Sequence, residues 1–498
     1  MKKIGYARLI DLLDLQVRPL TQTASTSSAI NKRQDTADTI LFPDGVVVTD
    51  TPLGQLEFAL RHEGVNLEVI DAAFEKMAPS LLIARIRANP NSEPIRRACF
   101  LWEWMHGATL DAGCITTGRY VDLFPPEIYA VAANPIKAPA FRVNNNALGN
   151  PDFCPVVKRS TLAHADEMLT LLRQLPALMS GDDSAALYAR AVRFLYLSET
   201  RSSFSIEREI PDANREERFV ALLSRAGEQE RVTEDWLVML QNAVIKDSYG
   251  KEPSYRTKQN WLEDSAGRMT FLPPPPDDLG KLMRGWTTFV NDQRSGIDLS
   301  IKTACAAFGF VYMHPFMDGN GRLHRFMIHH VLQRSGLLPD SLVLPVSASI
   351  AKDELAYLDV LSGFSKPVTR LWRYRRTDQA PLIDSSPGAR PYRYFEADRE
   401  VAFLQEMIQA TILTEIPNEL RYLRGYDAAF SELDATFDLP RSDISKLIRM
   451  IHGNDGVLSA TKRKQFAHLP EAVIDQVERI VRAAFPEDAQ PVKHSKPS

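Results

Sequence analysis

The sequence predicts a mainly α-helical protein built from several domains, and three observations predict this class. Apolar residues recur at every third or fourth position through most of the chain, which is the period of an amphipathic helix. Only a few stretches break this period, and one of them, 249–276, is interpreted as irregular or hairpin structure. The length of 498 residues corresponds to about three average domains.

The composition excludes several classes of protein. With 59 Lys and Arg against 63 Asp and Glu, the formal net charge is −4, which argues against wholesale, nonspecific binding of nucleic acid. Four widely spaced cysteines without a Cys-x-x-Cys pair disfavour a disulfide framework and a structural zinc site: Cys99, Cys114, Cys154 and Cys305. No apolar run is long enough to span a bilayer, and the N-terminus lacks the apolar core of a signal peptide. We expect a cytoplasmic protein with no membrane partner.

The first third of the chain divides into two regions. Residues 1–50 are expected to form an N-terminal arm and linker, because 21–39 is rich in Ser, Thr, Asp and Gln and poor in large apolar side chains. Residues 51–183 are expected to be mostly helical. Within them the apolar period predicts two short helices between Pro52 and Met77 and another over 95–106, and the Asn- and Pro-rich stretch 130–160 predicts loops and short strands.

Residues 184–380 are expected to form a helical core. The period predicts helices over 184–203, 233–245, 277–293, 298–312 and 320–336, and four prolines at 273–276 end the irregular stretch before them. A Ser-, Pro- and Gly-containing stretch predicts a linker at 381–394. Residues 395–498 then form a helical module with a polar tail from Pro486, either a winged-helix-like DNA-binding module or a helical interaction module. The basic cluster Lys462–Lys464 is small, so we favour the second.

One segment, His314-Pro315-Phe316-Met317-Asp318-Gly319-Asn320-Gly321-Arg322-Leu323-His324-Arg325, has the pattern of a phosphate site. A glycine-rich turn that opens a helix presents free backbone N–H groups and the positive end of the helix dipole. Gly319 and Gly321 allow phosphate oxygens to approach the backbone, and Asn320 adds a donor. Arg322 and Arg325 lie three residues apart on one helix face, which suits a polyphosphate.

Two residues of this segment predict chemistry rather than binding alone. Asp318 is a hard oxygen ligand of the kind that holds Mg²⁺ against phosphate oxygens. His314 has a side chain that titrates near neutrality, and it is placed to take a proton from an attacking hydroxyl. Pro315 disfavours a regular helix that would make these two residues a metal pair. Phe316 is expected to be an apolar plug. Three further histidines are expected to lie on a helix surface or to pack within the fold, namely His324, His329 and His330, and Cys305 is expected to be a small core residue.

The segment matches the signature His-Pro-Phe-x-Asp/Glu-Gly-Asn-Gly-Arg-x-x-Arg of the Fic (filamentation induced by cAMP, or Fido) family at every fixed position, and the resemblance extends over roughly 190–375. It implies a helical core that transfers AMP from Mg-ATP to a Ser, Thr or Tyr hydroxyl of a protein. It further implies that His314 is the general base and that Asp318 holds Mg²⁺. The remaining positions would bind the α-phosphate region (Gly319, Asn320, Gly321) and the outer phosphates (Arg322, Arg325).

A second stretch, Ser203-Phe204-Ser205-Ile206-Glu207, resembles the family's inhibitory helix, which carries Ser/Thr-x-x-x-Glu followed by Gly or Asn. Here Arg208 stands where Gly or Asn is usual. A glutamate at 207 that reached Arg325 would occupy the position of the γ-phosphate and hold ATP unproductively, so Ser203 and Glu207 are expected to be regulatory.

Two further stretches resemble parts of Fic proteins. Residues 255–271 resemble the hairpin flap that aligns a target chain by main-chain pairing. Tyr357, in Lys352-Asp353-Glu354-Leu355-Ala356-Tyr357, resembles a tyrosine that contacts the adenosine, and a core aromatic explains it equally well.

The expected activity is protein adenylyl transfer from Mg-ATP, restrained by Glu207. The expected partners are ATP, a target protein with a hydroxyl side chain, the chain itself as a target, and a second copy of the chain; nucleic acid is less favoured. Two alternatives stay open. One is removal of AMP, or transfer of another phosphate-containing group, at the same site. The other is a DNA-binding regulator whose Fic-like core senses nucleotide.

Overall fold

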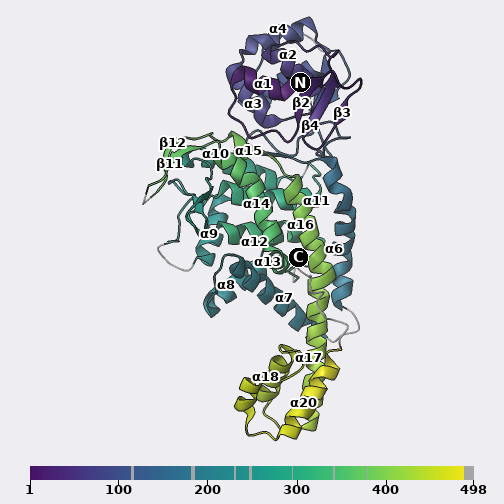
Figure 1. The fold of residues 1–498 in the computed structure, drawn as a ribbon, viewed down its shortest axis with the longest axis vertical. Helices are drawn as coiled ribbons and strands as arrows, with labels where there is room; N and C mark the ends of the chain where they lie inside the picture. The colour runs from purple at the N-terminus through teal and green to yellow at the C-terminus, as the bar shows by residue number, and fades with distance from the viewer. Residues whose placement is uncertain are drawn as a thin grey trace.

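The protein is an elongated stack of three units (Figure 1). The computed structural model describes residues 1–113, 117–180, 185–228, 231–245, 250–293, 295–339, 342–377 and 380–486. Helices dominate each unit, so the predicted mainly α class is confirmed. Across these residues, no helix combines the length and the apolar character needed to cross a bilayer.

The N-terminal unit is a group of helices with a small sheet on one side. Its helices pack around one apolar core: α1 (Gly5–Leu13), α2 (Pro52–His62), α3 (Leu67–Lys76), α4 (Pro79–Ala88) and α5 (Glu93–His106). Helices α2, α3 and α5 confirm the predicted ones. The expected arm at 1–50 is wrong, because it contains α1 and a sheet in the order β1-β2-β4-β3, formed by Lys2–Lys3, Thr23–Ser27, Thr39–Pro43 and Gln34–Asp35. Buried side chains at Ala24, Ile40 and Phe42 form the core of this sheet. Most of their neighbours in 21–39 are polar, so this stretch has too few apolar side chains for the strands to be predicted from its composition.

The loop-rich region expected at 130–160 is confirmed, and it contributes short strands. These are β6 (Ile136–Ala138), β7 (Val143–Asn145) and β8 (Cys154–Val156), with β5 (Val121–Asp122) just before them. Helix α6 (Ala165–Ser180) follows. Cys99, Cys154 and Cys305 are buried, and Cys114 lies outside the described residues.

The central unit is the helical core. Its main helices are α7 (Ala185–Ile206), α8 (Ala213–Leu223), α9 (Glu234–Val244), α10 (Pro276–Asn291), α11 (Leu299–Met313), α12 (Asn320–Arg334), α13 (Val346–Lys352), α14 (Glu354–Thr369) and α16 (Asp398–Ala410). Helix α11 lies in the middle of this unit and is buried on nearly every face. The hairpin expected within 249–276 is formed by β9 (Leu262–Glu263) and β10 (Met269–Phe271).

The linker expected at 381–394 is part of the folded core. It contains β12 (Leu382–Ser385), which pairs with β11 (Arg373–Arg375), and α15 (Arg390–Arg393). Strand β13 (Tyr394–Glu396) then pairs in parallel with β8 and joins the central unit to the N-terminal unit. Ser386, Pro387 and Gly388 lie between β12 and α15, and Tyr392 of α15 and Tyr394 of β13 are buried.

The C-terminal module begins later than the expected boundary at 395. Helix α16 continues through a π-helical turn (Thr411–Glu415) into the long helix α17 (Ile416–Thr436), and the first half of α17 packs on the central core through Ile416, Leu420 and Leu423. The second half forms a separate core with α18 (Arg441–His452) and α20 (Glu471–Ala484). Residues 487–498, most of the expected polar tail, lie outside the described residues.

Gly425 is the point of closest approach between α17 and α20. A Cβ there would lie 2.6 Å from Phe485 and 2.8 Å from the carbonyl oxygen of Ala484. We therefore expect Gly425→Ala to destabilise the C-terminal module by about 1–3 kcal/mol, although alanine favours a helix. Gly280→Ala in α10 is the matched control, because its Cβ would meet only Arg284, at 3.7 Å. The control should be stabilised by up to about 1 kcal/mol in calorimetric unfolding; equal effects of the two substitutions would contradict the packing argument.

Candidate active site

The segment singled out in the sequence forms a tight loop between α11 and α12. His314 ends α11 with a φ of 49°, and Gly319 begins α12 with a φ of 87°. The side chain of Asn320 closes the loop, because its Oδ1 accepts from the N–H of Phe316 at 3.0 Å and its Nδ2 donates to the carbonyl oxygen of Phe316 at 2.7 Å. The amide of Asn320 thus shapes the loop, and its predicted contact with phosphate stays a prediction. Phe316 is fully buried, as expected of a plug.

His314 is buried and neutral. Its side chain is 7% exposed, and its Nδ1 lies 3.3 Å from the carbonyl oxygen of Val311. Because a carbonyl can only accept, this contact places the proton on Nδ1 and leaves Nε2 with its lone pair. Burial, followed by the positive charge of Arg256, lowers the pKa of His314 to about 4. The imidazole is thus able to accept a proton at neutral pH.

A segment before the hairpin braces the loop, and sequence reasoning missed it. Glu252 accepts from the N–H of Met317 at 2.7 Å, and Arg256 donates from Nε to the carbonyl oxygen of His314 at 2.8 Å. Asn260 donates to the carbonyl oxygens of Phe316 and Met317 at 3.3 Å. These residues bind main-chain atoms that lie 56 to 65 positions away, so no spacing in the sequence reveals them.

The predicted regulatory residues meet the second arginine of the loop. Arg325 has no exposed surface, and its Nη2 lies 2.9 Å from Oε1 of Glu207. Ser203 accepts from the same guanidinium twice, through Oγ at 2.9 Å and through its carbonyl oxygen at 2.6 Å. A Cβ on Gly321 would lie 2.0 Å from Oε1 of Glu207, so the carboxylate sits directly against the start of α12. An anion therefore occupies the place expected for phosphate.

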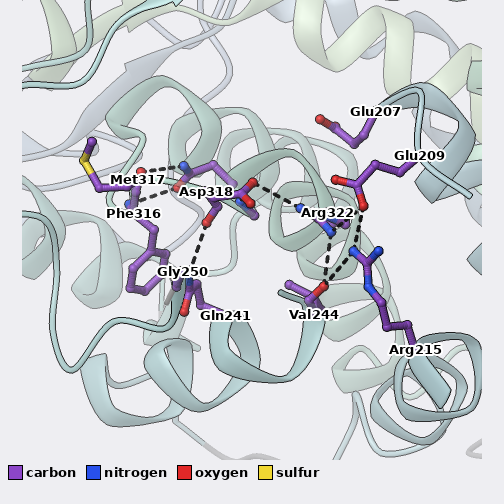
Figure 2. A network of polar contacts seen from close by, with 12 residues as sticks. Glu207, Glu209, Arg215, Gln241, Val244, Gly250, Phe316, Met317, Asp318 and Arg322 are labelled. Carbon is purple, nitrogen blue, oxygen red and sulfur yellow. Dashed lines mark hydrogen bonds and ion pairs between the residues drawn. The ribbon is translucent and has the colours of Figure 1, made fainter. Parts of the chain in front are cut away.

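The first arginine of the loop belongs to a second polar network (Figure 2). Arg322 donates from Nη2 to Asp318 at 3.1 Å and from Nη1 to the carbonyl oxygen of Val244 at 3.1 Å, and Oε2 of Glu209 lies 3.4 Å from Nη1. The same carboxylate oxygen accepts from Arg215 of α8 at 2.6 Å. Glu209 and Arg215 carry no motif, and sequence reasoning did not find them.

The turn that presents both glutamates has a defined geometry. The N–H of Glu209 donates to Phe204 at 3.0 Å, and the N–H of Arg208 donates to Ser205 at 2.8 Å, which is the paired bonding of a Schellman cap at the end of α7. Arg208 has a φ of 57°, in the left-handed region where glycine is favoured. This explains why the resemblance places Gly or Asn at that position.

Asp318 fits the predicted role of a magnesium ligand. Its side chain is 60% exposed at the start of α12, while one of its oxygens is held by Arg322 and by the N–H of Gly319. Mg²⁺ is commonly bound by one or two carboxylates together with substrate phosphates, and an exposed carboxylate beside an anion site meets that need. Among the described residues, no group of three or more metal-ligating side chains is present.

Tyr357 lies in the apolar core. It is 4% exposed and packs among the rings of Phe308, His324 and Phe403. This burial agrees with the interpretation of a core aromatic, and the adenosine contact stays a prediction. Three histidines of α12 are also buried, as expected: His324 against Phe308, His329 beside Glu199 at 2.9 Å, and His330 against the carbonyl oxygen of Ala226.

Known proteins resemble part of this chain. Residues 231–332 match the profile of the Fic/DOC family. A protein adenylyltransferase Fic from Nematostella vectensis is 30% identical over 112 residues, which are 22% of this chain and 25% of that protein. Another from Drosophila melanogaster is 36% identical over 69 residues, 14% of each chain. The chain therefore spans a quarter or less of these relatives.

Two solved structures are also similar. A Fic domain containing signaling protein from Bacteroides thetaiotaomicron overlays with a TM-score of 0.39 at 14% identity, over 52% of this chain and 97% of that one. Fic-1 from C. elegans overlays with a TM-score of 0.33 at 17% identity, over 73% and 99%. The match to the Fic/DOC family profile encloses the whole loop from His314 to Arg325, so the similarity to this family covers the candidate site.

Proposed function

We propose that this protein is an adenylyltransferase that transfers AMP from ATP to a hydroxyl side chain of a protein. The observation that carries the proposal is the site at the start of α12, where a neutral, buried His314 stands next to an anion-binding helix terminus. The glutamate against Gly321 and Arg325 supports it, because a carboxylate there marks a position suited to phosphate. The relatives named protein adenylyltransferase Fic agree with this activity.

The reaction follows from the geometry of His314. Nε2 takes the proton of the target hydroxyl, whose oxygen forms a bond to the α-phosphorus of ATP. The bond between that phosphorus and the oxygen bridging to the β-phosphate breaks, and pyrophosphate leaves. The N–H groups at the start of α12, with Arg322 and Arg325, stabilise the charge on the phosphates. Magnesium held by Asp318 would neutralise further phosphate charge.

We further propose that Glu207 inhibits this reaction. Its carboxylate is an anion on Arg325 and against Gly321, so it competes with a terminal phosphate for the same positive charge. The end of α7 holds it there through the Schellman cap around Arg208. The hairpin of β9 and β10 is a two-stranded antiparallel ribbon, and we assign it the flap role of aligning the target chain.

The C-terminal module fits an interaction or dimerisation role. In its basic cluster Lys462–Lys464, the side chain of Arg463 is held by Glu478 at 2.8 Å, so one of the three charges is neutralised within the module. This leaves little positive charge for a DNA backbone.

The first test uses α-labelled ATP, Mg²⁺ and the full chain, with and without cell lysate. Label that requires His314 would establish transfer and would show whether the chain labels itself or another protein. Absence of label from every variant would contradict the proposal, and release of AMP from a labelled protein would then point to the reverse reaction.

His314→Ala should reduce transfer by about 100- to 10,000-fold, because it removes the general base, while leaving ATP affinity nearly unchanged. Labelling rates and ATP titration measure the two effects. His164→Ala, at an exposed histidine of the N-terminal half, is the matched control and should transfer normally. Normal turnover of His314→Ala would show that another group is the base.

Glu207→Gly should raise both ATP affinity and labelling by about 5- to 150-fold, which is the usual range when one group opposes the binding of another. Removal of the carboxylate frees Arg325 for phosphate. Glu217→Gln, at an exposed carboxylate of α8, is the control and should change neither. If both variants behave like wild type, Glu207 is not inhibitory.

The pH profile of labelling, measured in Glu207→Gly, should reflect the low pKa of His314. The imidazole must be neutral to accept a proton, and a pKa near 4 keeps it neutral down to about pH 5. Arg256→Gln removes a charge that lowers this pKa, so activity should be lost at a higher pH. Lys258→Gln, an exposed charge of the same segment, should leave the acid limb unmoved. If Glu207→Gly with Arg256 intact loses its labelling activity near pH 6.5, the assignment of a low pKa to His314 is contradicted.

A further inference from the structure

Two buried arginine side chains lie side by side next to the candidate phosphate site. Arg322 is 2% exposed and Arg215 is 3% exposed, and both donate to the carbonyl oxygen of Val244, at 3.1 and 3.2 Å. Both guanidinium groups also lie over the ring of Phe204, at 5.3 and 4.8 Å from its centroid. Two like charges this close repel one another strongly in a poorly solvated site, and an anion between them relieves the repulsion.

Glu209 is that anion in the present state. Its Oε2 lies 2.6 Å from Arg215 and 3.4 Å from Arg322, so a single oxygen bridges the two cations (Figure 2). The side chain of Glu209 is about a third exposed, whereas the two arginine side chains are buried, so Glu209 lies between them and the solvent. An anion arriving from solvent meets Glu209 first.

The arginines retain hydrogen-bonding capacity that the described residues do not use. Nε of Arg215, Nε of Arg322 and Nη1 of Arg325 are buried and have no hydrogen-bond partner among these residues. Buried donors are almost always paired in native proteins, so these atoms are available to bond an anion that enters the site. Three adjacent guanidinium groups match the charge and the multiple acceptor oxygens of a polyphosphate.

We propose that Arg215 is a third phosphate-binding arginine of this site, and that Glu209 holds the place of a phosphate oxygen until a polyphosphate displaces it. The proposal rests on the proposed function and names the part of the substrate that Arg215 recognises, the terminal phosphates of a nucleoside triphosphate. Arg215 lies outside the region that matches the Fic/DOC family, so the family's signature does not contain it.

One turn links this exchange to the inhibitory contact. Glu207 and Glu209 flank Arg208, whose left-handed backbone conformation disfavours the turn. Glu207 contacts Arg325, and Glu209 contacts the other two arginines. Displacement of both carboxylates therefore exposes three guanidinium groups together and releases the strained turn.

A purely structural role for Arg215 makes a different prediction. If Arg215 only fastened the turn after α7 to α8, its loss would weaken every ligand alike and lower the melting temperature. If it binds terminal phosphates, its loss weakens ligands that have them and spares AMP.

The experiment is calorimetric titration of the full chain carrying Glu207→Gly and His314→Ala, which removes the first carboxylate and prevents turnover. Inorganic tripolyphosphate, ATP and AMP are the probes. Adding Glu209→Gln should tighten tripolyphosphate and ATP binding by about 5- to 150-fold. Adding Arg215→Gln to that variant should abolish the gain and leave AMP affinity within about twofold.

Controls separate recognition from folding. Arg218→Gln, at an exposed arginine of α8, should change no affinity. Arg215→Lys keeps the positive charge and serves if Arg215→Gln fails to fold; it should retain part of the tripolyphosphate affinity. Equal losses for AMP and tripolyphosphate, or no loss, would overturn the proposal, while ATP binding by the parent variant and transfer by the chain that keeps His314 would still support the proposed function. Failure of ATP to bind any variant would overturn the proposed function as well.

Discussion

The concentration of positive charge at the start of α12 is the constraint on which the rest of the site depends. Arg215, Arg322 and Arg325 have almost no exposed surface, and the N-terminal end of α12 adds its own partial positive charge. Charges that are taken out of water need partners of opposite sign, and several kcal/mol can depend on whether they find them. Glutamates from the turn after α7 meet this need in the present structure. The same need would favour phosphate at this site, so the proposed inhibition and the proposed substrate binding share one physical origin.

A second constraint acts on the loop from His314 to Gly319. Its backbone turns sharply, and a loop of this kind carries polar groups that a buried position must satisfy. Asn320 bonds within the loop, and Glu252, Arg256 and Asn260 bond from outside it. Arg256 serves two purposes, because its guanidinium holds the carbonyl of His314 and its charge lowers the pKa of the imidazole. One neighbour thus holds the backbone of His314 and adds to the effect of burial on its pKa.

The sequence predicted those parts of the molecule that depend on local pattern. Helical periodicity located most helices of the core, and the fixed spacing from His314 to Arg325 located the loop. It also predicted the contact of Glu207 with Arg325. Prediction failed where contacts join distant segments through the backbone or through unpatterned charges, as with Arg256 and Glu209. It failed again at 1–50 and 381–394, because a few apolar residues such as Ile40 or Tyr392 are enough to fold a polar stretch when a neighbouring surface covers them.

Gly321 lies where the contact with Glu207 and the proposed contact with phosphate meet. A Cβ there would collide with Glu207, and under the proposed function the same bare Cα lets phosphate reach the helix terminus. A single position therefore serves both contacts through the absence of a side chain. Under the proposed function, every substitution at 321 would change the contact with Glu207 and the access of phosphate at the same time, so neither could change without the other.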